Sequence, residues 1–172
     1  MKRTQAIELP EEEIAKQKEW MAAFAALEDR PHTYCVVTYG CQMNAHDSEK
    51  LEGMLTQMGM TPAANREEAD FVIFNTCCVR DNAQRRALGN VVWLKELKKT
   101  RPELMVGVCG CMMQQPGMGE QILKQYPFVD LAFGTHNLYR FAQLMLKAVQ
   151  SRRRVVEVIQ DDEGSIPEDL PV

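Results

Sequence analysis

Three cysteines of this 172-residue sequence each follow a short apolar run. Residues 34–38 precede Cys41, residues 71–75 precede Cys77, and residues 105–108 precede Cys111. Apolar runs of this length are typical of strands that a parallel sheet buries on both faces. Because the carboxyl ends of parallel strands share one edge of an open α/β sheet, where ligands bind, we expect the three cysteines to meet there.

Three thiolates at one edge suggest a metal centre with an open position. Structural zinc sites and saturated 4Fe-4S clusters usually take four protein ligands, so a set of three leaves one metal position for chemistry. The long spacings do not name the metal, and zinc remains an alternative to an iron–sulfur cluster. Two other interpretations also stay open: a nucleophilic cysteine, and thiols that are simply buried.

The other cysteines are expected to pack in the interior. Cys35 lies inside the first apolar run, and Cys109 ends the third. Cys78 is adjacent to Cys77, and neighbouring side chains in an extended segment point to opposite sides, so only one of the two can face a site. Cys77 is nearer the strand end and is the predicted ligand. Gly110, directly after Cys109, would let the backbone approach a bulky group closely.

The elements that position these cysteines alternate between strand and helix. Strands are predicted at 34–38, 71–75, 105–108 and 129–133, and the run 155–159 either adds a strand or leaves the domain. Helices are predicted at 44–58, 79–99, 118–125 and 137–150. Asn44 is the expected cap of the first of these helices, and Gly59 its stop. This order predicts an α/β fold: an open, mostly parallel β-sheet with helices on both faces, Rossmann-like or flavodoxin-like.

The chain divides into three predicted segments. Residues 1–31 form an N-terminal helical extension that starts near Pro10, with acidic residues in its first turn. Its apolar residues are expected to dock on the domain or on something missing from this sequence; they are Ile14, Trp20, Met21, Phe24 and Leu27. Residues 32–160 form the domain itself. Residues 161–172 are acidic and contain prolines, which is typical of a linker.

Composition narrows the classes of protein that fit. The net charge of −4 does not favour nucleic acid through bulk electrostatics. No stretch approaches the roughly 20 apolar residues of a membrane helix, and the N-terminus lacks an apolar signal core. We therefore expect a cytoplasmic protein with no membrane contact. In a reducing cytosol, six cysteines favour metal binding or catalysis over disulfides.

The remaining candidates carry weaker signals. The basic residues of and beside the helix 79–99 are Arg80, Arg85, Arg86, Lys95, Lys98, Lys99 and Arg101. A solvated face with neutralising neighbours is the favoured interpretation, and a phosphate-contacting face the alternative. The same alternatives apply to residues 152–154. His32, His46 and His136 share no spacing and are expected at the surface or at caps. Met112 and Met113 are expected in the core.

Three short motifs surround the cysteines at the predicted strand ends. They are Gly40-Cys41-Gln42-Met43-Asn44 with Asp47-Ser48-Glu49, Asn75-Thr76-Cys77 with Arg80, and Gly110-Cys111 with Gln114. Together they resemble the amino-terminal domain of the radical S-adenosylmethionine methylthiotransferases, over about residues 34–159. The Gln-Met-Asn sequence after Cys41 is similar to the tRNA enzymes that modify N6-isopentenyladenosine. The ribosomal-protein enzymes more often carry Pro-Lys-Asn there, and the threonylcarbamoyladenosine enzymes Lys-Val-Asn.

The resemblance implies a cofactor and a reaction. It implies that Cys41, Cys77 and Cys111 hold an auxiliary 4Fe-4S cluster with one iron not bound by cysteine. A second 4Fe-4S cluster cleaves S-adenosylmethionine to a radical that takes hydrogen from C2 of adenosine 37 in tRNA. Sulfur is then inserted, drawn from or through the auxiliary cluster, and a second S-adenosylmethionine supplies the methyl group.

The sequence departs from the family pattern in what it lacks. The Cys-x-x-x-Cys-x-x-Cys motif of the radical-generating cluster and the small RNA-binding domain are absent from these 172 residues. We therefore expect a domain that is inactive without the radical S-adenosylmethionine and RNA-binding domains. Alternatives are family enzymes that act on threonylcarbamoyladenosine tRNA or on a ribosomal protein, or a non-catalytic flavodoxin-like binding module with incidental cysteines.

Overall fold

The computed structural model describes residues 11–39, 42–76, 81–115 and 117–157, with the backbone alone for some of them, Cys111 included. The helices are α1 (Glu11–Ala25), α2 (Gln42–Gln57), α3 (Asp81–Thr100), α4 (Met118–Gln125) and α5 (Phe141–Ser151). The strands are β1 (Thr33–Thr38), β2 (Thr61–Pro62), β3 (Phe71–Thr76), β4 (Met105–Gly110), β5 (Leu131–Phe133) and β6 (Val155–Glu157). Two 3₁₀ helices are η1 (Cys111–Gln114) and η2 (Thr135–Arg140).

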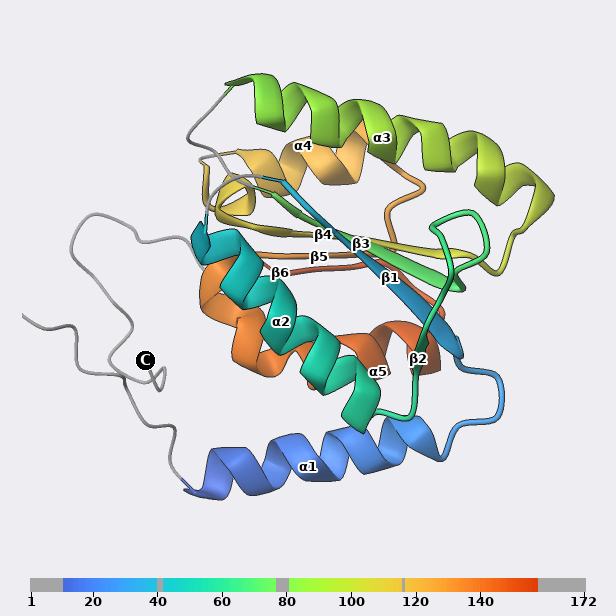
Figure 1. Ribbon diagram of the computed structural model, residues 1–172, viewed down its shortest axis with the longest axis vertical. Coiled ribbons are helices and arrows are strands. Elements are labelled where there is room, and N and C mark those ends of the chain that lie inside the picture. The colour runs from blue at the N-terminus through green and yellow to red at the C-terminus, as the bar shows by residue number, and fades with distance from the viewer. Residues whose placement is uncertain (1–10, 40–41, 77–80, 116, 158–172) are drawn as a thin grey trace, which may run out of the picture.

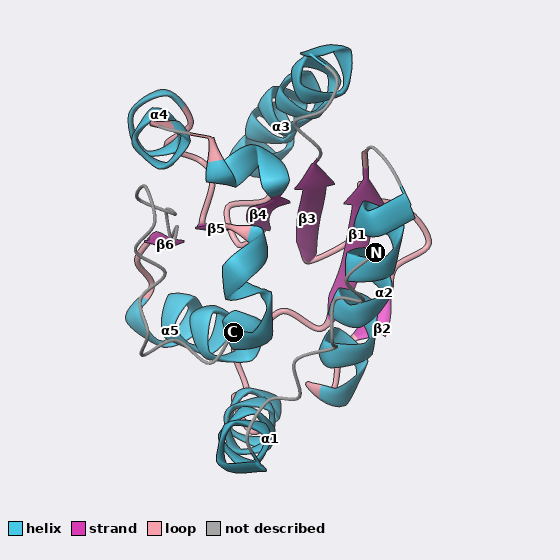
Figure 2. Cartoon of the chain, turned by 90° about the vertical axis from the view of Figure 1, so that its left-hand side faces the viewer, coloured by secondary structure: helices cyan, strands magenta, loops and turns pink. Residues whose placement is uncertain are grey.

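The described strands form one parallel sheet in the order β2-β1-β3-β4-β5-β6. Helices α3 and α4 cover one face, α2 and α5 cover the other, and α1 lies outside α2 and α5 (Figure 1). This confirms the predicted open parallel sheet with helices on both faces. The order is the flavodoxin-like one, in which the chain reverses direction across the sheet between β1 and β3. Figure 2 views the sheet from the edge where these strands end.

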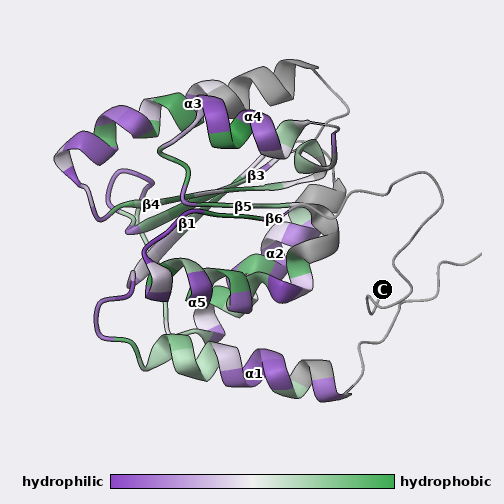
Figure 3. Ribbon diagram, turned by 180° about the vertical axis from the view of Figure 1, so that it is seen from behind, coloured by the Kyte–Doolittle hydropathy of each residue, from purple (hydrophilic) through white to green (hydrophobic). Residues whose placement is uncertain are grey.

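The hydrophobic core has one part on each face of the sheet. Alternation along β3 divides it, because successive side chains of a strand point to opposite faces. Phe71 and Ile73 pack towards α1, α2 and α5, whereas Val72 and Phe74 pack towards α3 and α4. Figure 3 shows hydrophobic strands between helices whose outer surfaces carry much of the hydrophilic sequence. The continuous apolar run was therefore a correct signal for a strand buried on both faces.

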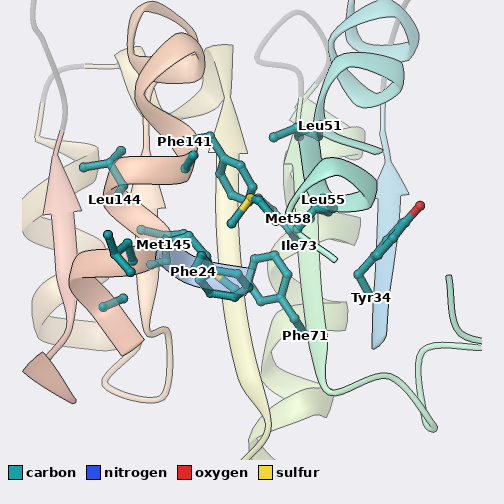
Figure 4. Packing of buried hydrophobic residues seen from close by; sticks show 14 of the residues in the cluster. Phe24, Tyr34, Leu51, Leu55, Met58, Phe71, Ile73, Phe141, Leu144 and Met145 are labelled. Atoms are coloured by element: carbon teal, nitrogen blue, oxygen red, sulfur yellow. The ribbon is translucent and has the colours of Figure 1, made fainter. Parts of the chain in front are cut away.

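Helix α1 docks on the domain through its apolar residues. Phe24 is fully buried and Met21 is 8% exposed, and both belong to the core on the α5 side. Phe24 lies among Phe71 of β3 and Met145 of α5 (Figure 4). The guanidinium carbon of Arg30 lies 5.8 Å from the centre of the Phe24 ring. The extension therefore contributes to the same core as the sheet.

Several predicted boundaries were wrong. Helix α2 begins at Gln42, so Asn44 lies inside it and is not its cap. The predicted helix 137–150 starts with the 3₁₀ turn η2, and α5 begins at Phe141, since helix ends often tighten in this way. Strand β5 is shorter than the run 129–133. The two-residue β2 was not predicted, because so short a strand carries no periodicity. The run from Val155 does add a strand, β6.

Three described basic residues in and just after α3 are paired with acids. Lys98 bonds to Asp130, Lys99 to Glu96, and Arg101 to Asp70. The expected neutralising neighbours are confirmed for these residues, but only Lys99 is largely exposed to solvent. Arg80 and the side chains of Arg85 and Arg86 lie outside the described residues.

Arg154 has a structural role rather than a phosphate-contacting one. Its guanidinium donates to the carbonyls of Ile122, Leu123 and Tyr126 at the end of α4, and to that of Val129. These carbonyls lie in the last turn of α4 and just beyond it, where intrahelical donors run out, although that of Ile122 also accepts from the Tyr126 amide. Burial lowers the pKa of Arg154, and Asp130 opposes that shift. Among the described helices, none is long and apolar enough to cross a bilayer.

The described histidines lie at the surface, and Met112 and Met113 lie in the core. His32 is exposed, and the His46 side chain is 68% exposed beside Glu49, as expected for surface histidines. The side chain of His136 lies outside the described residues. Met112 and Met113 are fully buried on the α3–α4 side, which confirms the expectation that they pack in the core.

We expect Phe24→Ala to lower the free energy of unfolding by about 3–5 kcal/mol, because it removes a fully buried ring. Urea denaturation followed by circular dichroism measures the change. Lys18→Ala, on the exposed side of the same helix, is the matched control and should stay within about 0.5 kcal/mol of the wild type. Equal stability of the two variants would show that α1 is not docked in solution.

Candidate metal centre at the edge of the sheet

Strands β1, β3 and β4 end at the same level. Thr38 pairs in register with Asn75, which in turn pairs with Cys109. The backbone amide of Tyr39 donates to the carbonyl of Asn75 at 2.9 Å, so the alignment extends one residue beyond β1. Neighbouring parallel strands lie about 4.8 Å apart. The prediction that these three strand ends meet at one edge is confirmed.

The predicted ligands themselves follow these ends in the sequence. Cys77 comes directly after Thr76, which is in register with Gly110, and Cys111 comes directly after Gly110. Cys41, Cys77 and Cys78 lie outside the described residues, and only the backbone of Cys111 is described. Within the described residues, no three His, Cys, Asp or Glu side chains are grouped to hold a metal ion. The three-cysteine ligand set therefore stays a prediction.

Gly110 allows the end of β4 to approach β3 very closely. Its φ of 104° lies in the region that side chains disfavour. A Cβ at this position would lie 2.3 Å from the Thr76 carbonyl oxygen and 2.7 Å from Oδ1 of Asn75. The approach that demands glycine here is thus to the neighbouring strand. The expected approach to a bulky group is not tested by these contacts.

A buried polar cluster lies directly beneath this edge. Oγ of Ser48 in α2 lies 2.7 Å from Oγ1 of Thr38 and accepts a hydrogen bond from Nδ2 of Asn75 at 3.0 Å. Oγ1 of Thr76 donates to the Cys109 carbonyl at 3.0 Å. Ser48, Asn75 and Thr76 are 5%, 1% and 0% exposed. The sequence analysis noted Ser48, Asn75 and Thr76 as parts of motifs and did not predict their buried contacts. The polar pair Asn75-Thr76, directly after four apolar strand residues, was a signal that could have indicated such a role.

Tyr39, just before the Gly40-Cys41 step, is held by α3. Its ring stacks on Phe74 with centroids 6.1 Å apart, and its hydroxyl accepts a hydrogen bond from Nδ2 of Asn90. Nη1 of Arg66 donates to Oδ1 of Asn90 at 3.2 Å. The Arg66 guanidinium also lies over the Trp93 ring, 5.0 Å from its centre. The end of β1 is therefore fixed from the α3 side as well as from α2.

The surroundings of two further cysteines disfavour the thiolate form. Cys109 is 2% exposed, and burial, reinforced by the Asp47 carboxylate, raises the pKa of its thiol far above the usual range. Burial also raises the pKa of Cys35, partly opposed by Arg66. Since metals and electrophiles react with the thiolate, a raised pKa makes both thiols less reactive than an ordinary cysteine. Cys109 is buried in the core as predicted, whereas Cys35 is only partly buried and packs against the core.

The fold defines a flavodoxin-like α/β domain in which the chain reverses across the sheet beside the strand ends that precede Cys41 and Cys77 in the sequence. Residues 33–134 match the sequence model described as "Uncharacterized protein family UPF0004". The chain belongs to this family, and its resemblance to the methylthiotransferases is confirmed by the relatives described next.

The chain is similar to several proteins named tRNA-2-methylthio-N(6)-dimethylallyladenosine synthase. The protein from Clostridium perfringens (strain SM101) is 50% identical over 139 residues, which is 81% of this chain and 31% of the relative. The one from Acetivibrio thermocellus is 47% identical over 168 residues, covering 94% and 35%. The one from Thermoanaerobacter sp. (strain X514) is 47% identical over 167 residues, covering 96% and 35%. The chain thus spans about a third of these relatives.

We expect Gly110→Ala to lower the free energy of unfolding by about 2–4 kcal/mol, because the new Cβ combines a positive φ with a clash against β3 backbone. Chemical denaturation measures the loss. Gly53→Ala is the matched control, since a Cβ on Gly53 in α2 would have no atom within 4 Å. That change should raise stability by about 0.5–1 kcal/mol. Unchanged stability in Gly110→Ala would contradict the close strand approach.

Proposed function

We propose that this chain supplies a three-cysteine iron–sulfur centre to a tRNA methylthiotransferase. The observation that carries the proposal is the common level at which β1, β3 and β4 end, just before Cys41, Cys77 and Cys111 in the sequence. Open α/β sheets bind ligands at such an edge, where the strand order reverses. The names of the relatives support the choice of enzyme class.

The residues at this edge fit an iron–sulfur cluster. Cysteine thiolates are the usual ligands of such clusters, whereas burial raises the pKa of the two other described thiols, Cys35 and Cys109. Cys41, Cys77 and Cys111 would hold an auxiliary 4Fe-4S cluster with one iron free of cysteine. Bound there, the cluster would provide an open iron or sulfide position for the delivery of sulfur to the substrate.

The chain's own contribution is to hold and shield the three cysteine segments. The polar cluster of Thr38, Ser48 and Asn75 ties the ends of β1 and β3 to α2. The buried Asn75 and Thr76 close the edge from below, because both are almost completely removed from solvent. Substrate would then approach from the opposite side, beyond the carboxyl ends of the strands.

The complete enzyme would convert N6-isopentenyladenosine at position 37 of tRNA to its 2-methylthio derivative. The C2–H bond of the adenine is replaced by C2–S–CH₃ through radical sulfur insertion and methylation. A second 4Fe-4S cluster and S-adenosylmethionine would belong to the radical S-adenosylmethionine domain of the complete enzyme, which would also have an RNA-binding domain. This chain alone would be inactive, and the complete enzyme would act on its tRNA substrate in the cytoplasm.

Anaerobic reconstitution with iron and sulfide tests the centre. We expect about four irons per chain, one of them spectroscopically distinct by Mössbauer spectroscopy, because three thiolates leave one iron open. Cys41→Ala and Cys111→Ala should lose most of this iron. Cys35→Ala is the matched control and should retain it, since Cys35 packs against the core. A folded wild-type chain without specific iron, or one that binds zinc alone, would refute the cluster.

A chimera tests the substrate. We expect activity when this chain replaces the corresponding third of the Clostridium perfringens relative, with 2-methylthio formation on isopentenyladenosine tRNA measured by nucleoside mass spectrometry. The same chimera carrying Cys41→Ala should lose activity by about a hundredfold or more, because removal of a metal ligand disables the centre. Product on threonylcarbamoyladenosine tRNA or on a ribosomal protein instead would point to the sister enzymes. The unaltered relative is the positive control.

A further inference from the structure

We propose that Asn75 is a positioning residue that locks the carboxyl ends of β1, β3 and β4 together, with Ser48 as its partner. Its significance for a metal centre rests on the proposed function, but the contacts that support it involve described residues alone. The juxtaposition to explain is that one buried residue of β3 contacts the other two segments as well. Its side-chain amide contacts Ser48 and lies against Gly110, and its backbone carbonyl accepts from Tyr39 at the end of β1.

The first contact joins Asn75 to the segments on either side of Cys41. Nδ2 of Asn75 donates to Oγ of Ser48 at 3.0 Å, and the same Oγ lies 2.7 Å from Oγ1 of Thr38. Thr38 is three residues before Cys41, and Ser48 is in the second turn of the helix that begins at Gln42. The carbonyl of Asn75 also accepts from the backbone amide of Tyr39. Asn75 therefore holds the chain both before and after Cys41.

The second contact joins Asn75 to the segment before Cys111. Oδ1 of Asn75 lies 2.7 Å from the position a Cβ on Gly110 would occupy. The amide therefore sits directly against the backbone of Gly110. Asn75 itself is two residues before Cys77. Its side chain thus spans from Ser48 of α2 on one side to the end of β4 on the other.

Asn75 is buried although its side chain is polar. Asn75 is 1% exposed, at the end of a strand whose four preceding residues are all apolar and fully buried. A buried amide is unfavourable unless its polar atoms are hydrogen-bonded, and a β-branched apolar residue would suit a central strand better. A residue that breaks the local pattern in this way is expected where function requires it. The requirement here is a fixed spacing between three strand ends.

Capture of arsenite by the reduced, metal-free chain measures that spacing without any cluster. Arsenite binds three thiols at once, with one As–S bond formed and one water released for each thiol, and arsenic stays As(III). We expect one arsenic per wild-type chain, with Cys41, Cys77 and Cys111 protected from later alkylation, as identified by peptide mass spectrometry. If the fold already holds the three thiols close together, arsenite binding loses less conformational entropy and is therefore tighter.

Ser48→Ala removes the hydroxyl that Asn75 and Thr38 share, and Asn75→Leu removes the amide. We expect each to weaken arsenite binding by about tenfold or more, the scale of one buried hydrogen bond lost from the bound geometry. Thr33→Ala is the matched control, because it removes one hydrogen bond, to the amide of Asp70, at the opposite end of β1. It should reduce stability comparably and leave arsenite binding unchanged. Ser48→Ala keeps the test valid if Asn75→Leu fails to fold.

Each outcome decides between the proposals. Weaker binding in Ser48→Ala than in Thr33→Ala at similar stability supports the positioning role. Equal binding in wild type, Ser48→Ala and Asn75→Leu overturns the role of Asn75 and leaves the three-thiol site standing. If the folded wild-type chain does not protect Cys41, Cys77 and Cys111 together, both the positioning role and the proposed centre are wrong.

Discussion

The parallel pairing of β1, β3 and β4 is the constraint on which the rest of this structure depends. Because the pairing is parallel and in register, three segments far apart in the sequence leave the sheet at one edge and at one level. A helix must carry the chain back after each strand, which explains why α2, α3 and α4 each follow the edge and cover the sheet on both faces (Figure 1). The candidate centre is thus a consequence of the topology.

Close packing at that edge is maintained by polar contacts in an apolar setting. Gly110 lets β4 touch β3, and the hydroxyl of Ser48 joins the hydroxyl of Thr38 to the buried amide of Asn75. Hydrogen bonds in such surroundings are stronger electrostatically, and a missing partner is correspondingly unfavourable. The arrangement favours one spacing of the strand ends over alternatives. A centre built from three separate loops needs this kind of rigidity.

Sequence reasoning succeeded where the signal was long and periodic. The stripe of Leu51, Leu55 and Met58 in α2 and the continuous run Phe71–Phe74 identified their elements correctly, because both patterns reflect burial directly. It failed where the signal was short or local. The strand β2 has two residues, and the start of α2 at Gln42 depends on how the chain turns after β1. The 3₁₀ turn η2 likewise left no periodic trace.

The sequence by itself determined that cysteines follow three apolar strands and that the sheet is parallel, since strand and helix alternate along the chain. It also marked Cys35 and Cys109 as interior residues, because both lie within apolar runs. Only the tertiary structure decided that β1 lies beside β3 and β3 beside β4, and that Ser48 and Asn75 meet beneath their ends. The physical reason is that periodicity reports the burial of each element, whereas strand order and contacts across the sheet arise from how whole elements pack together.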